Sequence, residues 1–316
     1  MRTPLLPLFA ALFFCTTASA APGTINNADA AIASPGFSLQ FRGDTIPYSI
    51  FGVFVMPGED VEISVPEDDV KMRAQSGDLS EKSPGKWRWQ APRDPGVTRL
   101  WATHSKTGKR ILLNAFIKTP FGYDKETLNG YRIGHYEAKA LRGDPVYNRP
   151  PGFIEVTEAN RNTRVSPHFT LGQFLCHQQD GPPRYLVLRE ALVLKLERIL
   201  ADLNAGGRAL DTLFVMSGYR TPWYNRHIGN RTKYSRHLYG GAADIFPDGD
   251  NDGRMDDLNG DGVVNRRDAE VLAALVEAHP GNAGEQRLIG GIGIYGPAPH
   301  RGPFVHVDVR GYQARW

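Results

Sequence analysis

The segment SRHLYGGAADI, residues 235–245, constrains the fold and the chemistry of this chain more than any other stretch. It places His237 and Asp244 on either side of a run of glycine and alanine. Residues without bulky side chains let a backbone turn closely and approach its neighbours, so the histidine and the acid can face a common point. The segment is therefore either a tight bend with polar ends or part of a metal site.

A second part of the same pattern is FVHVDVRG, near the end of the sequence. Because side chains alternate along an extended strand, His306 and Asp308 are expected to face the same side of a sheet. Two histidines and one carboxylate that leave a position open are the ligand set of a catalytic zinc site. A lone histidine beside glycines is more often an ordinary hydrogen-bonded residue, so the hypothesis depends on the joint occurrence of these segments.

Together with SGYR at residues 217–220, these segments resemble the zinc D-Ala-D-Ala peptidase family. That fold group also includes the vancomycin-resistance dipeptidase and the hedgehog signalling domains. The family pattern is S-G-[YF]-R, then S-x-H-x-x-G-x-A-x-D, then a late histidine on a strand, and this chain matches it at each place. The resemblance covers residues 166–316 and is strongest to the periplasmic peptidoglycan hydrolases.

The resemblance implies a role for each matching residue. Ser235 and Tyr219 are the implied substrate-binding residues. Arg220 would stabilise a developing oxyanion or hold a substrate carboxylate, because a guanidinium stays charged and offers several N–H donors. The alternative for Arg220 is a structural salt bridge. The implied zinc ligands are His237, Asp244 and His306.

The sequence departs from the family pattern at the general base. Relatives commonly place an acid three residues before the last ligand or a histidine two before it, where this chain has Pro303 and Phe304. The remaining candidates for a catalytic base are Asp308 and His300. Asp308 could instead orient a metal-bound histidine through a hydrogen bond.

The function that the resemblance implies is zinc-assisted hydrolysis of an amide bond in peptidoglycan peptides. Whether the enzyme is a carboxypeptidase or an endopeptidase stays open. The alternative is a non-catalytic zinc-containing module that binds the cell wall. The missing upstream base favours this alternative, and the presence of Arg220 and Ser235 opposes it.

Residues 1–20 are typical of a secretory signal peptide. They contain one basic residue and an apolar run from Leu5 to Phe14, and they end in small residues that suit cleavage after Ala20. The run is about half the roughly 20 residues that a membrane span needs. We therefore expect an exported protein, periplasmic or extracellular, without a transmembrane segment in the mature chain. Its one remaining cysteine, Cys176, could form no intramolecular disulfide.

The rest of the sequence divides into three stretches, and the expected fold class is α+β. Residues 22–120 contain short β-branched and aromatic runs between turn formers, which predicts an antiparallel β-sandwich similar to immunoglobulin-like accessory domains. Residues 121–165 show little periodicity and are expected to form a connector over the surface. Residues 166–316 mix helical and strand patterns, as an α+β zinc peptidase domain of the hedgehog and D-Ala-D-Ala peptidase type would.

An acidic insertion at residues 248–268 has the pattern of two overlapping calcium loops. Oxygen-bearing side chains recur at alternate positions, and a glycine occupies the sixth position of each loop. The alternative is an acidic, solvated loop. A bound calcium would brace the loop that follows Asp244. The candidate ligands are Asp248, Asp250, Asp252, Asp256, Asp257, Asn259, Asp261, Val263 through its carbonyl group, Asn265 and Asp268.

The formal net charge of the chain is +3, and the charged residues are scattered along it. We therefore expect no nucleic-acid partner, since such partners require a concentrated basic surface. The sequence leaves the oligomeric state open.

Overall fold

The computed structural model describes residues 35–278 and 285–316. The predicted signal peptide, residues 1–20, lies outside the described residues. Within the described ranges, none of the helices has both the length and the apolar character needed to cross a membrane.

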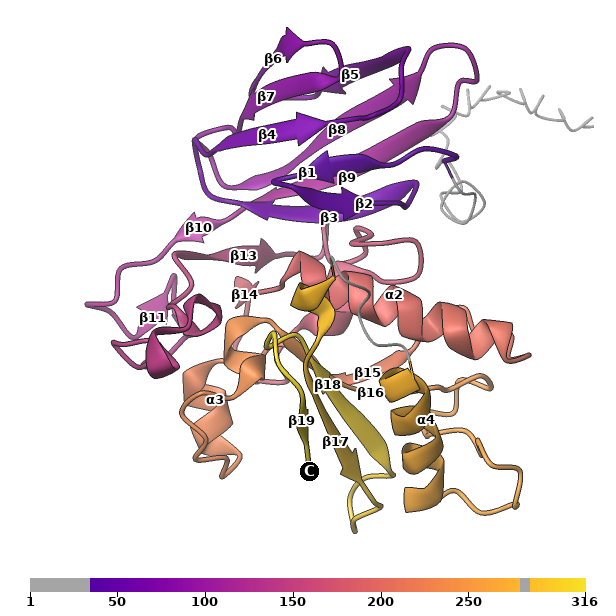
Figure 1. Cartoon of the computed structure of the whole chain (residues 1–316). Coiled ribbons are helices and arrows are strands. Elements are labelled where there is room, and N and C mark those ends of the chain that lie inside the picture. The colour runs from indigo at the N-terminus through magenta and orange to yellow at the C-terminus, as the bar shows by residue number, and fades with distance from the viewer. Residues whose placement is uncertain (1–34, 279–284) are drawn as a thin grey trace, which may run out of the picture.

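Strands β1 to β9 form two sheets that share a buried core (Figure 1). The first has the order β2-β1-β4-β7-β6, and the second has the order β3-β9-β8-β5. In β7 the sequence KWRWQ alternates, so Trp87 and Trp89 are buried between exposed polar residues. The bounds are Leu39–Phe41 (β1), Asp44–Ile46 (β2), Ile50–Val55 (β3), Asp60–Ser64 (β4), Val70–Ala74 (β5), Asp78–Ser83 (β6), Lys86–Gln90 (β7), Gly96–His104 (β8) and Arg110–Ile117 (β9).

One strand pair corrects the expectation of an antiparallel sandwich. Strand β3 pairs in parallel with β9 along the whole length of β3, while the other pairs of these two sheets are antiparallel. Alternation in a sequence indicates which side chains are buried but not the direction of the partner strand. The mixed α+β class is confirmed, and the likeness to immunoglobulin domains stays a prediction.

Residues 121–165 contribute to the core, contrary to the expectation of a connector over the surface. Tyr131, Phe153 and Val165 are fully buried, and the carbonyl oxygen of Val165 accepts a hydrogen bond from the backbone of Gly52 at 2.7 Å. The apolar residues of this stretch are unevenly spaced among turn formers, so no helical or strand periodicity in the sequence indicates that they are buried. Strands β10 (Thr119–Pro120), β13 (Gly152–Val156) and β14 (Arg184–Leu186) form one sheet, and β11 (Thr127–Leu128) pairs with β12 (Tyr131–Arg132).

A five-stranded sheet of the order β15-β16-β18-β17-β19 forms the centre of the C-terminal part. Its strands are Phe214–Ser217 (β15), Ala242–Phe246 (β16), Gly291–Tyr295 (β17), Phe304–Asp308 (β18) and Ala314–Arg315 (β19). Helix α4 (Arg266–Ala278) lies against β17 and β18 and contacts α2 (Glu190–Ala205), whereas the short α3 (Pro222–His227) stands apart from both (Figure 1).

Short 3-10 helices occupy several of the connections. They are Leu141–Gly143 (η1), Pro145–Tyr147 (η2), Leu171–Phe174 (η3), Arg236–Tyr239 (η4) and Gln286–Leu288 (η5). Of these, η4 precedes β16, one of the two adjacent strands on which the candidate site is built.

Candidate metal centre

The register of the C-terminal sheet brings two of the implied zinc ligands together. Asp244 on β16 is the direct partner of His306 on β18, and on its other side Asp244 pairs with Ser217 on β15. Side chains directly opposite each other on antiparallel strands are neighbours on one face. The sheet alone therefore places a carboxylate beside an imidazole.

The third residue, His237, reaches the same point from η4. The helix ends at Gly240, whose φ of 64° lies in the left-handed region. A Cβ atom at Gly240 would lie 2.4 Å from the carbonyl oxygen of Val187, so only glycine fits this turn. The small residues between His237 and Asp244 thus allow the chain to reverse its direction and allow its backbone to lie close to that of Val187.

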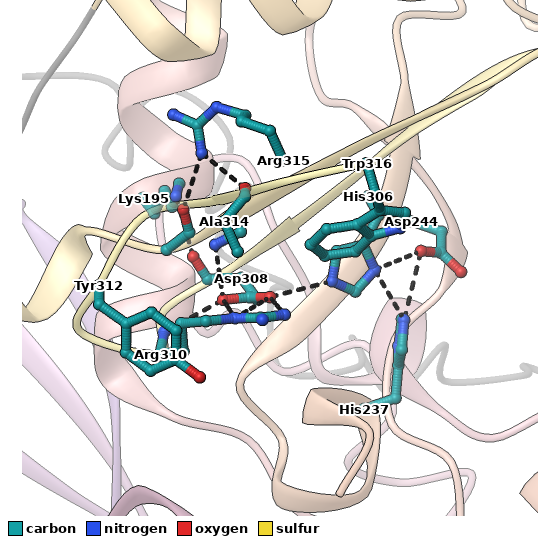
Figure 2. A network of polar contacts seen from close by, with 12 residues as sticks. Lys195, His237, Asp244, His306, Asp308, Arg310, Tyr312, Ala314, Arg315 and Trp316 are labelled. Carbon is teal, nitrogen blue, oxygen red and sulfur yellow. Dashed lines mark hydrogen bonds and ion pairs between the residues drawn. The ribbon is translucent and has the colours of Figure 1, made fainter. Parts of the chain in front are cut away.

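Three potential ligand atoms converge in the interior of the protein (Figure 2). His237 Nε2 lies 3.1 Å from His306 Nδ1, and Asp244 Oδ1 lies 2.9 Å from His306 Nδ1 and 3.2 Å from His237 Nε2. A tetrahedral zinc ion with bonds of about 2.0 Å holds its ligand atoms roughly 3.3 Å apart. The residues present therefore fit a zinc ion, with a further coordination position left for water or substrate.

Hydrogen bonds behind each ring fix which nitrogen faces this point. His237 Nδ1 lies 2.7 Å from the carbonyl oxygen of Gly218, which can only accept. His306 Nε2 lies 3.2 Å from Asp308 Oδ2. Each of these nitrogens therefore carries a proton and donates it, which leaves His237 Nε2 and His306 Nδ1 with free lone pairs. Two lone pairs and a carboxylate oxygen at one point form a donor set for a divalent cation.

The protonation states of His237 and Asp244 agree with this arrangement, whereas that of His306 opposes it. Burial lowers the pKa of His237, so its ring is neutral near pH 7. Burial would raise the pKa of Asp244, but the neighbouring His237 and His306 hold it well below the ordinary value. Burial would also lower the pKa of His306, but hydrogen bonds with Asp244 and Asp308 outweigh burial and raise it, so a metal ion at Nδ1 would have to displace a proton shared with Asp244. The site thus contains an ionised carboxylate between two imidazoles.

Asp308 lies behind His306, outside the cavity. Its side chain is fully buried, forms an ion pair with Arg310 at 2.5 Å and accepts the backbone N–H of Gly291 at 2.9 Å. Burial would raise the pKa of Asp308, but its hydrogen bonds with His306 and Arg310 hold it far below the ordinary value. An acid so placed orients His306 and is poorly suited to accept a proton from a substrate or a water molecule.

Two further predicted residues are not brought to the site. Tyr219 is 1% exposed, and its hydroxyl lies 3.0 Å from that of Tyr136 in the core. It directly precedes Arg220, and neighbouring residues in an extended segment point in opposite directions. His300 lies on an exposed turn between Ala298 and Arg301 and does not line the cavity.

A cavity of about 660 Å³ opens over the three converging residues. Arg220 and Ser235 line it, as predicted for pocket residues. Arg220 Nη2 forms an ion pair with Asp244 Oδ2 at 2.5 Å, and Arg220 Nε donates to Ser217 Oγ at 2.8 Å. Arg220 therefore lies in a salt bridge and at the cavity wall at the same time, next to the oxygen of Asp244 that faces away from the histidines.

Several residues that line this cavity were not predicted from the sequence. Three of them, Arg310, Tyr312 and Trp316, follow β18 within a few residues. The signal that could have revealed Arg310 is the alternation His306, Asp308, Arg310, which continues one face of the strand. The other unpredicted residues lining the cavity are Leu141, Tyr147, Asn230, Thr232, Lys233, Tyr234, Arg236, Tyr295 and Phe304.

In the insertion, acids of the first loop (residues 248–259) converge and those of the second (residues 257–268) do not. Carboxylate oxygens of Asp248, Asp250 and Asp256 all lie within 4.8 Å of one another. In the second loop, both oxygens of the buried Asp268 accept backbone N–H groups, from Leu258 at 2.8 Å and Asn265 at 2.7 Å. The remaining candidates form hydrogen bonds within the loop: Asp252, Asp257, Asn259, Asp261, Val263 and Asn265.

The comparisons with known proteins give one match. Residues 167–260 match the family model described as Peptidase M15. This segment contains Arg220, Ser235, His237 and Asp244, and it ends before β18. Searches among curated proteins and among solved structures gave no match. The resemblance inferred from the motifs is thus confirmed over residues 167–260, which are similar to the Peptidase M15 family of zinc D-Ala-D-Ala carboxypeptidases.

Proposed function

We propose that this chain is an exported zinc metallopeptidase that hydrolyses amide bonds in peptidoglycan stem peptides or cross-links. The observation that carries the proposal is the convergence of His237 Nε2, Asp244 Oδ1 and His306 Nδ1 within 2.9 to 3.2 Å of one another. They lie at a cavity, and two of them belong to the segment that matches Peptidase M15. The pattern of residues 1–20 supports export.

The three ligand residues would hold zinc, which polarises an amide carbonyl group and lowers the pKa of a water molecule to about 7. Arg220 supplies a charged donor at the cavity wall, where a negative charge on the carbonyl oxygen would develop. Its ion pair with Asp244 and its hydrogen bond to Ser217 fix the guanidinium in place. The role of Arg220 is thus positioning of the ligand and stabilisation of the transition state.

The charges around the cavity indicate which substrates fit. Lys233, Arg236 and Arg310 line it together with Arg220, whereas Asp244 is the sole side-chain carboxylate among the residues that line it. A cavity with this balance attracts anionic substrates. Stem peptides carry free carboxylates, which suits the proposed substrate class.

The alternative function is a zinc-containing module that binds wall peptides without cleaving them. The observation that favours it is the same composition of the cavity, because its lining offers no acid beyond Asp244 and no histidine beyond His237 and His306 as a proton acceptor. Hydrolysis then requires that the water and the substrate amide exchange protons through another group.

One experiment separates the two functions. Mature protein is analysed for zinc and incubated with purified muropeptides, with and without a chelator, and the products are identified by mass spectrometry. We expect one zinc per chain, chelator-sensitive cleavage of an amide bond, and loss of both properties in His237→Ala and His306→Ala. His227→Ala, an exposed histidine outside the cavity, is the control. Stoichiometric zinc without cleavage would support the binding module.

For the insertion we propose a structural calcium site of modest affinity. The support is the convergence of Asp248, Asp250 and Asp256 and the repeated spacing of oxygen-bearing side chains. The loop follows β16, which carries Asp244, so a cation here would stiffen the chain next to the metal centre.

A further inference from the structure

An aromatic wall, formed by Tyr295, Phe304 and Trp316, closes one side of the cavity. The rings of Tyr295 and Phe304 stack with centroids 4.5 Å apart and planes 5° apart. The indole nitrogen of Trp316 donates a hydrogen bond to the hydroxyl of Tyr295 at 2.7 Å. The three rings therefore support one another and hold a defined orientation.

The strand beneath Trp316 is shaped to receive its ring. Gly293 on β17 is the partner of His306 on β18, so both lie on the face of the sheet that carries the metal centre. A Cβ atom at Gly293 would lie 2.5 Å from the indole nitrogen, and one at Gly291 would lie 2.8 Å from the far edge of the ring. The indole can lie against β17 only because both positions are glycine.

The backbone also fixes Trp316. Its backbone oxygen accepts a hydrogen bond from the N–H of Ile294 at 3.0 Å, and its backbone N–H donates to the carbonyl oxygen of Ile292 at 3.3 Å. The indole centroid lies 5.1 Å from that of His306, and the two rings are neighbours in Figure 2. Nevertheless the side chain is 48% exposed. A large apolar ring that is firmly held and yet half exposed beside a metal centre is typical of a binding surface.

We propose that Trp316 contacts the substrate and forms the subsite for an aliphatic side chain next to the scissile amide, on the side of His306. The exposed part of the indole suits a methyl or methylene group. The guanidinium of Arg310 lies over one part of the ring, 5.1 Å from its centroid, and Arg220 and Lys233 also line the cavity. This inference rests on the proposed function. It adds a specificity residue that lies outside residues 167–260, the segment that matches the family.

The test compares Trp316→Ala, Trp316→Phe and Gly293→Ala with the wild type on a synthetic stem pentapeptide ending in D-Ala-D-Ala. Loss of this aliphatic contact corresponds to a rise in KM of roughly 10- to 100-fold, which is about 1.4 to 2.8 kcal/mol. We expect this rise in Trp316→Ala, a smaller rise in Trp316→Phe, and less than about a threefold change in kcat. Gly293→Ala retains the tryptophan but displaces its ring, so it should resemble Trp316→Ala.

A second measurement does not depend on turnover. Binding of the same pentapeptide to zinc-loaded protein is followed by tryptophan fluorescence, and the signal of Trp316→Phe is subtracted from that of the wild type. We expect the difference signal to saturate with the peptide, and we expect Trp101→Phe, a substitution in the sandwich, to leave the titration unchanged. A difference signal without cleavage would overturn the proposed function but support the subsite.

Three results would overturn the inference. These are equal pentapeptide affinity in Trp316→Ala and the wild type, no pentapeptide binding to the wild type, and a loss of zinc from Trp316→Ala that accounts for its whole defect. The last result would mean that Trp316 acts only by supporting His306.

Discussion

Asp308 Oδ2 lies 3.2 Å from Nε2 of His306, on the side of the imidazole that faces away from the cavity. Because the pKa of Asp308 is held far below its ordinary value, this carboxylate is ionised and can only accept hydrogen bonds. It therefore keeps the proton of His306 on Nε2 and leaves Nδ1 free. The sequence HVD thus encodes a candidate ligand and the group that orients it, two positions apart on one strand face.

Asp308→Asn should weaken zinc binding by about 10- to 100-fold, the usual effect of losing the partner of a metal-bound histidine. Asparagine retains the shape but no longer provides the charge that stabilises the N–H of His306 and Arg310. Zinc affinity is measured by competition with a chelator of known affinity. Asp60→Asn, which removes an exposed partner of Arg88 in the sandwich, is the control. Unchanged affinity in Asp308→Asn would show that His306 does not need this partner.

Arg220→Ala should lower kcat by about 10²- to 10³-fold, as expected for loss of an oxyanion donor. Arg220→Lys should recover little of the lost kcat. Arginine contacts Ser217 and Asp244 through two different nitrogens of its planar guanidinium, whereas lysine has a single nitrogen. Zinc content is determined in parallel. If activity falls only in proportion to lost zinc, Arg220 acts solely through Asp244.

The sequence predicted the convergence of His237, Asp244 and His306 because their spacing reflects local geometry. His306 and Asp308 alternate on one strand, and glycine marks the reversal before Asp244. Tyr219 was assigned to the pocket together with its neighbour Arg220, although adjacent residues of an extended segment face opposite sides. The structure shows that alternation: Arg220 lines the cavity and Tyr219 lies in the core.

Other features depend on partners distant in the sequence and therefore leave no local pattern. The parallel pairing of β3 with β9 is one case, since a strand pattern does not state the direction of its partner. Trp316 is another, because its place at the cavity requires that Gly291 and Gly293 of β17 have no side chains. The alternate glycines in GGIGIYG are the only sign of this contact in the sequence. Their role is apparent only from the structure, in which the indole of Trp316 lies over them.

Calcium should raise the thermal midpoint of unfolding if the insertion binds it. A ligand at 100 times its dissociation constant adds about 2.7 kcal/mol to the free energy of unfolding. We expect a saturable increase with calcium chloride in wild-type protein and a smaller one in Asp250→Asn, because Asp250 belongs to the convergent group. Magnesium at equal ionic strength is the control. A midpoint that responds equally to both salts would indicate an ordinary solvated acidic loop.

Lys195 makes stability depend on pH in the alkaline range. Its Nζ donates to the backbone oxygen of Asp308 at 2.9 Å, and burial lowers the pKa of Lys195 to about 8. In the unfolded chain the ordinary lysine pKa is about 10.4. Between these values the unfolded chain binds more protons than the folded one, so the free energy of unfolding should rise with pH in this window and stay level below it.

The full contribution of Lys195 to that rise is about 3 kcal/mol, since each pKa unit corresponds to about 1.36 kcal/mol. Urea unfolding of the wild type and of Lys195→Met at pH 7.5 and pH 10 isolates it, because the other titrating groups are common to both proteins. Relative to the wild type, Lys195→Met should become less stable as the pH increases. In the wild type, the higher pH removes the buried charge of Lys195 and raises the free energy of unfolding, whereas methionine has no charge to lose. Parallel pH profiles for the two proteins would show that the amine beside Asp308 keeps its ordinary pKa.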